Sequence, residues 1–208
     1  MSVELAVIGG GNMARAIVEG AIRGGVLRSS QVAIADPDDT CRSFFDQLGC
    51  VTVQCAMDLP KTKYTLIAVK PQVFDEVASC ITSEIIYSIM AGVSTSRISQ
   101  AIGNECVIRV MPNLPCSMGY GAAGLALGSG ATAEDAQLAI ELFSAVGSVV
   151  EVEEPLMDAV TAVSARLNCW VVKSRSVYLE ITPVPADDSP SLSACSLLRA
   201  RARTIRPR

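Results

Sequence analysis

The chain has 208 residues, half of them hydrophobic, so it is long enough for one domain and part of a second around a sizeable core. Because it contains no histidine, mechanisms that need a histidine base or ligand are excluded, and nothing in the sequence points to a metal. A net charge of −4 with 4% aromatic residues argues against a nucleic-acid surface. No run of about 18 apolar residues is present. The eight cysteines form no C-x-x-C pair, so we expect a cytoplasmic protein with buried thiols and no membrane contact.

The first stretch with a chemical meaning lies at residues 3–14. Residues 3–8 form a nearly all-apolar run, typical of a buried parallel strand, and Gly9, Gly11 and Ala14 then fit the pattern G-x-G-x-x-A where a helical pattern begins. In such a unit the first glycine permits a tight turn, the second lets a pyrophosphate approach the backbone, and the small third residue lets helix and strand pack closely. Free N–H groups at the helix start supply the anion site. The alternative is a glycine-rich turn that binds nothing.

The next strand favours the first of these interpretations. Residues 32–35 are apolar, and Asp36 ends the run, where a carboxylate can accept hydrogen bonds from both ribose hydroxyls of an adenosine. A strand, a glycine turn, a helix and a second strand with a terminal acid, in this order, predict a dinucleotide-binding site.

After Asp36 the pattern alternates between helix and strand. The predicted helices lie at residues 39–48, 71–81 and 94–102, and the predicted strands at residues 51–53, 64–69, 85–90 and 107–110. This alternation is typical of an α/β fold with a doubly wound parallel sheet, a dinucleotide-binding domain of the Rossmann type.

Such sheets bind ligands along the carboxyl ends of their strands. The segments that follow the predicted strand ends therefore belong to one crevice, and they are residues 9–13, Asp36, Val69-Lys70-Pro71, Ala91-Gly92 and Met111-Pro112-Asn113. Each also has a plain structural interpretation. Lys70 could be a solvated cation at a strand end, and Asn113 could be a turn residue.

Residues 119–164 extend this pattern. Residues 119–130 are glycine-rich with a strand-like centre, a helix is predicted to open at Thr132, and residues 148–152 are predicted to form a last strand. A further apolar helix is predicted to open at Glu154-Pro155. We therefore expect a dinucleotide-binding domain at residues 1–152 and the start of a helical domain at residues 153–164.

The composition changes at Ala165. The last 44 residues hold 8 of the 17 basic residues and 3 of the 21 acidic ones, and they are rich in Ser and Pro. Prolines exclude a long helix after residue 181. We predict that residues 165–208 form a disordered tail, with a basic contact patch at residues 199–208 as the alternative.

Five motifs taken together resemble the pyrroline-5-carboxylate reductase family. They span residues 1–164 in the family's order and spacing, and they are Ile8-Gly-Gly-Gly-Asn-Met-Ala14, Ala68-Val-Lys-Pro-Gln72, Ser88-Ile-Met-Ala-Gly-Val93, Arg109-Val-Met-Pro-Asn113 and Met157-Asp-Ala-Val-Thr-Ala-Val-Ser164. The resemblance implies reduction of the cyclic imine 1-pyrroline-5-carboxylate to L-proline with NADH or NADPH, the last step of proline biosynthesis, in a homo-oligomer.

The resemblance also implies a cofactor site, carried over by matching position, with no catalytic residue assigned. Ile8, Gly9, Gly10, Gly11, Asn12 and Met13 would cradle the pyrophosphate, and Asp36 would meet the adenosine ribose. Val69, Lys70, Pro71, Ala91 and Gly92 would line the cofactor groove, and Asn113 would lie near the nicotinamide.

Three departures from the family pattern matter. Many relatives carry Ser, Asn or Arg where this chain has Asp36, which would repel a 2′-phosphate, so we expect NADH to be preferred over NADPH. Ala56 stands where relatives often have an Asn that reaches the adenosine. Ser164 is followed by Ala165-Arg-Leu-Asn-Cys-Trp170, whereas relatives continue into Gly-Ser-Gly-Pro-Ala-Tyr, which holds the substrate carboxylate, and into the helical dimerisation domain. We therefore expect the substrate half to be absent and activity to be in doubt, and a frame shift near Ser164 would explain the change.

Two other functions stay open from the sequence. One is a non-catalytic dinucleotide-binding or partner-binding module derived from such an enzyme. The other is a different NAD(P)-dependent reductase on the same fold, such as a β-hydroxyacid dehydrogenase-like or deazaflavin-using enzyme. Formation of proline from 1-pyrroline-5-carboxylate would separate a pyrroline-5-carboxylate reductase from both of these alternatives.

Overall fold

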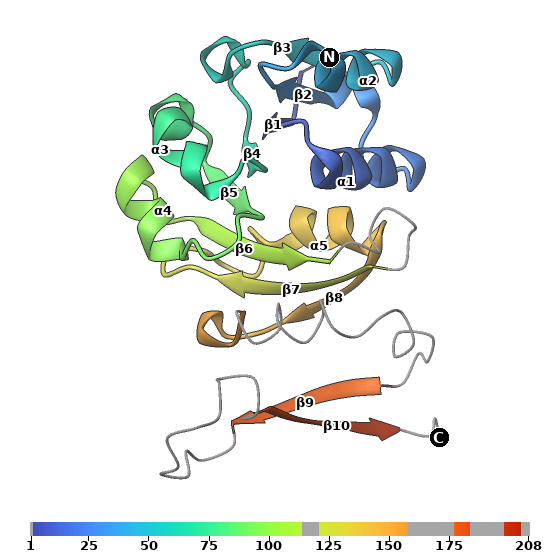
Figure 1. Ribbon diagram of the computed structural model, residues 1–208, viewed down its shortest axis with the longest axis vertical. Helices are drawn as coiled ribbons and strands as arrows, with labels where there is room; N and C mark the ends of the chain where they lie inside the picture. The colour runs from blue at the N-terminus through green and yellow to red at the C-terminus, as the bar shows by residue number, and fades with distance from the viewer. Residues whose placement is uncertain (1, 114–120, 158–176, 184–197, 205–208) are drawn as a thin grey trace.

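The computed structural model of the protein describes residues 2–113, 121–157, 177–183 and 198–204. Its main feature is an eight-stranded sheet in the order β3-β2-β1-β4-β5-β6-β7-β8 (Figure 1). The strands of this sheet are β1 (Leu5–Ile8), β2 (Val32–Ala35), β3 (Val51–Val53), β4 (Tyr64–Ile67), β5 (Ile85–Ser88), β6 (Val107–Pro112), β7 (Gly121–Leu127) and β8 (Gly147–Glu151).

The first six strands pair in parallel, which confirms the predicted doubly wound sheet. Strand β7 then runs antiparallel to β6, and β8 pairs in parallel with β7. The chain moves outward from β1 to β2 and β3, and then crosses back to place β4 on the other side of β1. The point between β1 and β4 is the topological switch point where open α/β sheets bind ligands.

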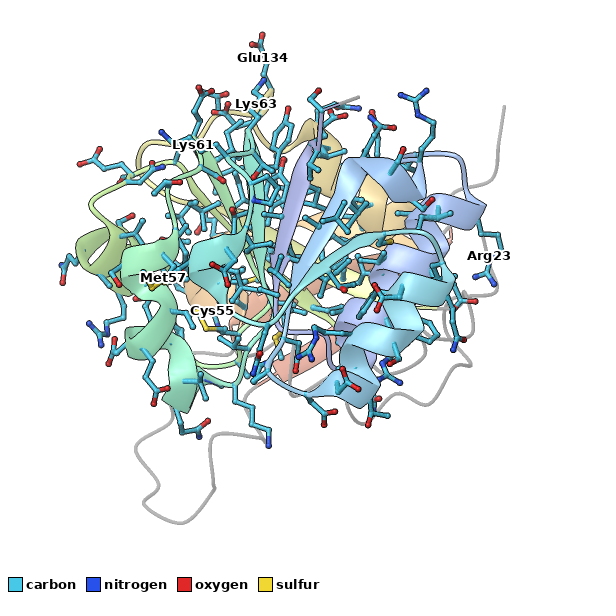
Figure 2. The ribbon with its side chains drawn as sticks, turned by 90° about the horizontal axis from the view of Figure 1, so that it is seen from above. Arg23, Cys55, Met57, Lys61, Lys63 and Glu134 are labelled. Carbon is cyan, nitrogen blue, oxygen red and sulfur yellow. The ribbon has the colours of Figure 1, made fainter. Side chains whose placement is uncertain are left out.

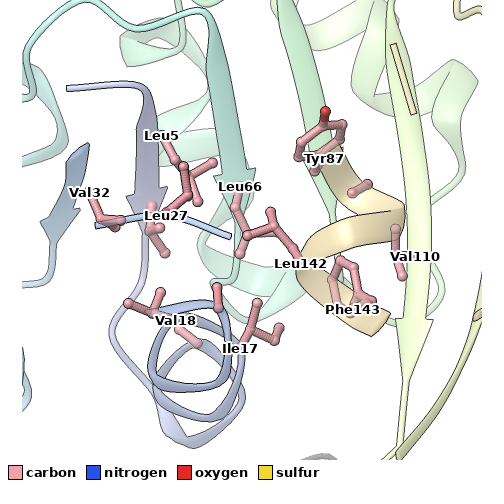
Figure 3. Close-up of a cluster of buried hydrophobic side chains, with 14 of the residues drawn as sticks. Leu5, Ile17, Val18, Leu27, Val32, Leu66, Tyr87, Val110, Leu142 and Phe143 are labelled. Atoms are coloured by element: carbon pink, nitrogen blue, oxygen red, sulfur yellow. The ribbon is translucent and has the colours of Figure 1, made fainter. Parts of the chain in front are cut away.

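Helices cover both faces of the sheet. They are α1 (Asn12–Arg23), α2 (Asp39–Gln47), α3 (Phe74–Val77), α4 (Thr95–Ile102) and α5 (Gln137–Ser144). One hydrophobic core includes side chains of α1, α2 and α5, among them Ile17, Phe45 and Leu142, and Figure 3 shows part of it. A second core on the other face includes Phe74 of α3 and Ile98 of α4. Successive strand residues point to opposite faces, so each buried strand contributes to both cores.

Helix α1 packs closely against the segment between α5 and β8. A Cβ added at Gly20 would overlap Cγ1 of Val146, which is itself buried. The absence of a side chain at position 20 therefore allows α1 to approach the α5–β8 connection, and it fixes the glycine loop at the start of α1 relative to the sheet.

Most predicted elements are confirmed, with differences at two helices. The helix predicted at residues 71–81 is instead a run of short pieces, η3 (Pro71–Val73), α3 and η4 (Ala78–Cys80). Val73 and Val77 depart from ideal helical angles at φ −94° and −104°, and β-branched residues fit a helix poorly. Helix α5 begins at Gln137 because Thr132 and Asp135 bond each other in a preceding turn.

The carboxyl-terminal part is described only in places. The start predicted for a helix at Glu154 is a short 3-10 turn, η6 (Glu154–Leu156), and residues 158–164 of the proposed helical start lie outside the described residues. Within the predicted tail, β9 (Val177–Pro183) and β10 (Leu198–Thr204) pair as a separate antiparallel ladder. Two strands alone are marginally stable in water, so the disorder predicted for the tail stays a prediction.

The described cysteines are less buried than predicted. Cys50 is buried, and burial raises the pKa of its thiol to about 11, but Cys55 is exposed and Cys41, Cys80 and Cys106 are partly exposed. Cys55 follows β3, which is an edge strand that pairs only with β2 in the sheet, and this explains its exposure.

Candidate cofactor-binding site

The strand register brings the predicted site segments to one edge of the sheet. Ile8 is level with Ala35 on one side and with Ile67 on the other, and Ile67 is level with Ser88. The residues that follow these four strand ends are therefore neighbours, as predicted. Lys61, Lys63 and Glu134 lie toward the opposite edge, and Figure 2 shows these three side chains together at one side of the molecule, away from Cys55 and Met57.

The glycine loop has the geometry that its motif predicts. Gly9 has a φ of +98°, and a Cβ at this position would lie 2.8 Å from the carbonyl oxygen of Ala68. Gly11 is the N-cap of α1 in an extended conformation, and an added Cβ there would meet nothing within 4 Å. The first turn of α1, which includes Asn12 and Met13, has no acidic residue. The amino end of α1 is thus open to an anion, which its N–H groups and dipole would attract.

Asp36 holds the loop in place. Its Oδ2 accepts a hydrogen bond from the Gly10 N–H at 2.6 Å, and its Oδ1 accepts one from the Asp38 N–H at 2.8 Å. A Cβ at Gly10 would lie 3.0 Å from the Phe45 ring, so this loop residue fits closely between Phe45 and Asp36. Each carboxylate oxygen has two lone pairs, so both oxygens keep capacity to accept a ribose hydroxyl. The sequence predicted the ribose role of Asp36 but not its bond to Gly10.

Two arginines flank this turn. The Arg15 guanidinium lies 4.9 Å from the centre of the Phe44 ring and donates to the carbonyl oxygens of Gly10 and Thr40, both at 3.3 Å. Arg42 donates to the carbonyl oxygens of Asp36 and Pro37 at 2.6 and 2.9 Å, and it pairs with Asp39. Sequence reasoning missed both arginines, because only the fold brings helix α1 and the start of α2 to the same turn.

Acidic groups dominate this turn all the same. Asp38 is the N-cap of α2, and hydrogen bonds from the backbone N–H groups of Thr40 and Cys41 hold the pKa of its carboxyl below the ordinary value. With Asp36 and Asp39, three carboxylates surround the end of β2, against two guanidinium groups that are already bound to backbone carbonyls. The local charge at the end of β2 therefore disfavours the binding of a further negative group there.

The remaining predicted residues lie at the same edge with different contacts. Val69 is partly buried, while Lys70 and Pro71 are exposed at the start of η3, which follows β4. Ala91 and Gly92 are exposed before α4, and Gly92 has a φ of +71°. Asn113 follows the end of β6, and its Oδ1 accepts a hydrogen bond from the Ala122 N–H at 2.9 Å. Asn113 thus joins β6 to β7 in addition to its predicted place near the cofactor.

Other kinds of site are not found in the described part of the chain. Residues 2–113 and 121–157 contain no group of three or more His, Cys, Asp or Glu side chains arranged to hold a metal ion. No helix among the described residues is long and apolar enough to cross a membrane.

Comparison with known proteins identifies the family. Residues 4–92 match a family model described as NADP oxidoreductase coenzyme F420-dependent. A pyrroline-5-carboxylate reductase of Pisum sativum is 32% identical over 208 aligned residues, which cover 96% of this chain and 76% of that protein. The chain belongs to the pyrroline-5-carboxylate reductase family.

Two further members of the pyrroline-5-carboxylate reductase family show how much of it the chain spans. The Haemophilus influenzae protein is 38% identical over 77% of this chain and 62% of its own length. The solved structure of the Coxiella burnetii pyrroline-5-carboxylate reductase superposes with a TM-score of 0.72 at 28% identity, over 78% of this chain and 64% of that one. The chain thus spans about two thirds of the length of these two relatives, and the Rossmann-type fold is the part they share.

Proposed function

We propose that this chain binds NAD(P)H at the carboxyl edge of the sheet and derives from an enzyme that reduces 1-pyrroline-5-carboxylate to L-proline. The main observation behind the proposal is that the amino end of α1 is open to an anion. The glycine loop that precedes it is held by the hydrogen bond from the Gly10 N–H to Asp36. The names of the related proteins support the substrate. The nicotinamide would supply hydride for the imine carbon, while a proton goes to the ring nitrogen.

The residue roles follow from the positions along this edge. Residues 8–13 would hold the pyrophosphate, with the N–H groups at the start of α1 facing it, because the Gly9 and Gly10 N–H groups are already bonded to Ala35 and Asp36. The two oxygens of Asp36 would accept the ribose hydroxyls. The exposed segments 69–71 and 91–92 would line the groove, and Asn113 would lie toward the nicotinamide. This part of the reaction is mainly orientation of the cofactor.

We also propose that NADH is the preferred cofactor. A 2′-phosphate carries a charge of about −1.5 to −2, and it would enter a turn that already holds Asp36, Asp38 and Asp39. Arg15 and Arg42 compensate only in part, because three carboxylates face two guanidinium groups and Arg42 already pairs with Asp39.

The substrate half is the second part of the proposal. The sequence contains no Gly-Ser-Gly-Pro-Ala-Tyr after Ser164, so we propose that the chain as written binds cofactor without turning over 1-pyrroline-5-carboxylate. A cytoplasmic location and homo-oligomeric assembly are proposed with the family. The second candidate is a dinucleotide-binding or partner-binding module derived from such an enzyme, whose role is binding and not a lost catalytic step, because the described site consists of cofactor-binding features alone.

The test is a proline-linked assay on the 208-residue chain with NADH and 1-pyrroline-5-carboxylate, run beside a fluorescence titration of NADH. We expect NADH binding without formation of proline. Proline formation would show that the chain completes a substrate site, and absence of NADH binding would contradict the proposed function as a whole.

A further inference from the structure

Glu154 connects the carboxyl-terminal exit of the sheet to the start of a distant helix. Its Oε1 accepts a hydrogen bond from the Thr95 N–H at 2.7 Å, and its Oε2 accepts one from the Thr95 hydroxyl at 2.6 Å. The two residues are 59 positions apart. Helix α4 is thus capped twice, by the side chain of its own N-cap Ser94 and by a carboxylate from the other end of the domain.

The surroundings of this contact are buried and charged. Thr95 is 5% exposed and Arg109 on β6 is 4% exposed, and the Arg109 guanidinium lies 3.8 Å from Glu154 Oε1. A Cβ at Gly128, just after β7, would lie 3.2 Å from Thr95 Cβ, so Thr95 is enclosed on that side. A charged acceptor facing a buried guanidinium and a helix amino end is strongly favoured in this position.

Thr95 belongs to a segment that leads from the proposed cofactor groove, whereas Glu154 follows β8, which runs antiparallel to β6 and ends toward the amino end of that strand. Thr95 comes three residues after Gly92, whose positive φ sets the turn into α4. Arg109 lies on β6, the strand that Asn113 follows. Glu154 begins η6, which leads to the buried Met157.

We propose that Glu154 is a positioning residue that holds the segment 91–95 in the place where it meets the nicotinamide half of the cofactor. The proposal rests on the function proposed above. The bond to the Thr95 N–H fixes the first residue of α4, and the loop before it then has little freedom. Because the adenosine half would be held by β1, β2 and α1, Glu154 should affect only the nicotinamide half.

The experiment compares two nucleotides on the full chain. NADH spans both halves of the groove, whereas ADP occupies only the adenosine and pyrophosphate half. Glu154→Gln removes one of the two acceptor oxygens and the charge that faces Arg109, although one amide oxygen can still accept from Thr95. We expect it to raise the Kd for NADH about tenfold and to leave the Kd for ADP within about twofold, measured by fluorescence and calorimetry. A purely structural role would change both constants together or neither.

Matched variants make the result specific. Glu153→Gln changes the neighbouring exposed carboxylate, whose side chain faces solvent, and should leave both constants unchanged. Thr95→Val removes the hydroxyl donor and should reproduce part of the NADH effect, while Thr95→Ser keeps the donor and should restore binding. If Glu154→Gln does not fold, the Thr95 pair decides the question.

The outcomes separate the two proposals. A selective loss of NADH binding in Glu154→Gln and Thr95→Val supports the positioning role. Equal effects on NADH and ADP, or none on either, overturn it while the proposed function stands. If the unmodified chain binds neither nucleotide, the proposed function is wrong and the positioning role is wrong with it.

Discussion

At the residue scale, Asp36 has two tasks, and its position in the sequence predicts only one of them. It accepts the Gly10 N–H and so fixes the glycine loop, and it presents a carboxylate where we propose that the ribose binds. This hydrogen bond joins residues 26 positions apart, so no local sequence pattern predicts it. A substitution at Asp36 must therefore keep a hydrogen-bond acceptor if only cofactor choice is to change.

Asp36→Asn meets this condition because its amide oxygen can still accept from Gly10. Removing one negative charge beside Arg15 and Arg42 should move the ratio of the Kd values for NADPH and NADH about tenfold toward NADPH. Fluorescence titrations with both cofactors measure the ratio. Asp46→Asn at the far end of α2 is the control, and an unchanged ratio in Asp36→Asn would refute the charge argument.

Gly9 and Gly25 form a matched pair for the glycine loop. Both have a positive φ, at +98° and +73°, but only Gly9 has a backbone carbonyl within 2.8 Å of an added Cβ, and Gly25 has open space around it. Gly25→Ala should cost about 1 kcal/mol of unfolding free energy. Gly9→Ala should cost about 1–3 kcal/mol more, through overlap with Ala68, and should also weaken NADH binding.

Urea unfolding and NADH titration of the two variants check this prediction. Equal destabilisation of both would mean that the loop shifts away from β4 without cost, and that the close approach at Ala68 does not fix the site.

At the element scale, the packing of α1 on the α5–β8 connection sets where the anion-binding helix end lies. Alanine at position 20 would favour the helix by about 1 kcal/mol, but its Cβ would overlap Val146, which is buried and stiff. Gly20→Ala should therefore destabilise the protein by about 1–3 kcal/mol. In a Val146→Ala background the same change should be neutral or stabilising. A double-mutant cycle by urea unfolding measures how the effect of Gly20→Ala on the unfolding free energy depends on residue 146. The same effect with Val146 and with Val146→Ala would show that the overlap between positions 20 and 146 does not matter.

The elements also show what a sequence can and cannot predict. Short apolar runs bounded by glycine, proline or acid identified β1, β2, β4 and β5, because buried parallel strands need little else. Residues 71–81 were predicted as one helix and are three short pieces, since periodicity does not report the distorted angles at Val73 and Val77. The antiparallel orientation of β7 was not predicted at all.

At the scale of the whole molecule, the contacts missed by the sequence are those between distant segments. Arg15 with Thr40, Asp36 with Gly10, and Glu154 with Thr95 each depend on the order of the strands in the sheet. The edge at which the site forms could be predicted from the strand ends, because parallel strands in register must end together. Which side chains meet there could not, because charge and hydrogen-bond partners come from elements far apart in the chain.

Each proposal above requires the described domain to bind NADH. A titration of the 208-residue chain with NADH, followed by nucleotide fluorescence and repeated with Gly9→Ala and Gly25→Ala, tests it most directly. We expect saturable binding in the unmodified chain and in Gly25→Ala, and markedly weaker binding in Gly9→Ala. No saturable binding in the unmodified chain, or equal binding in all three, would contradict it.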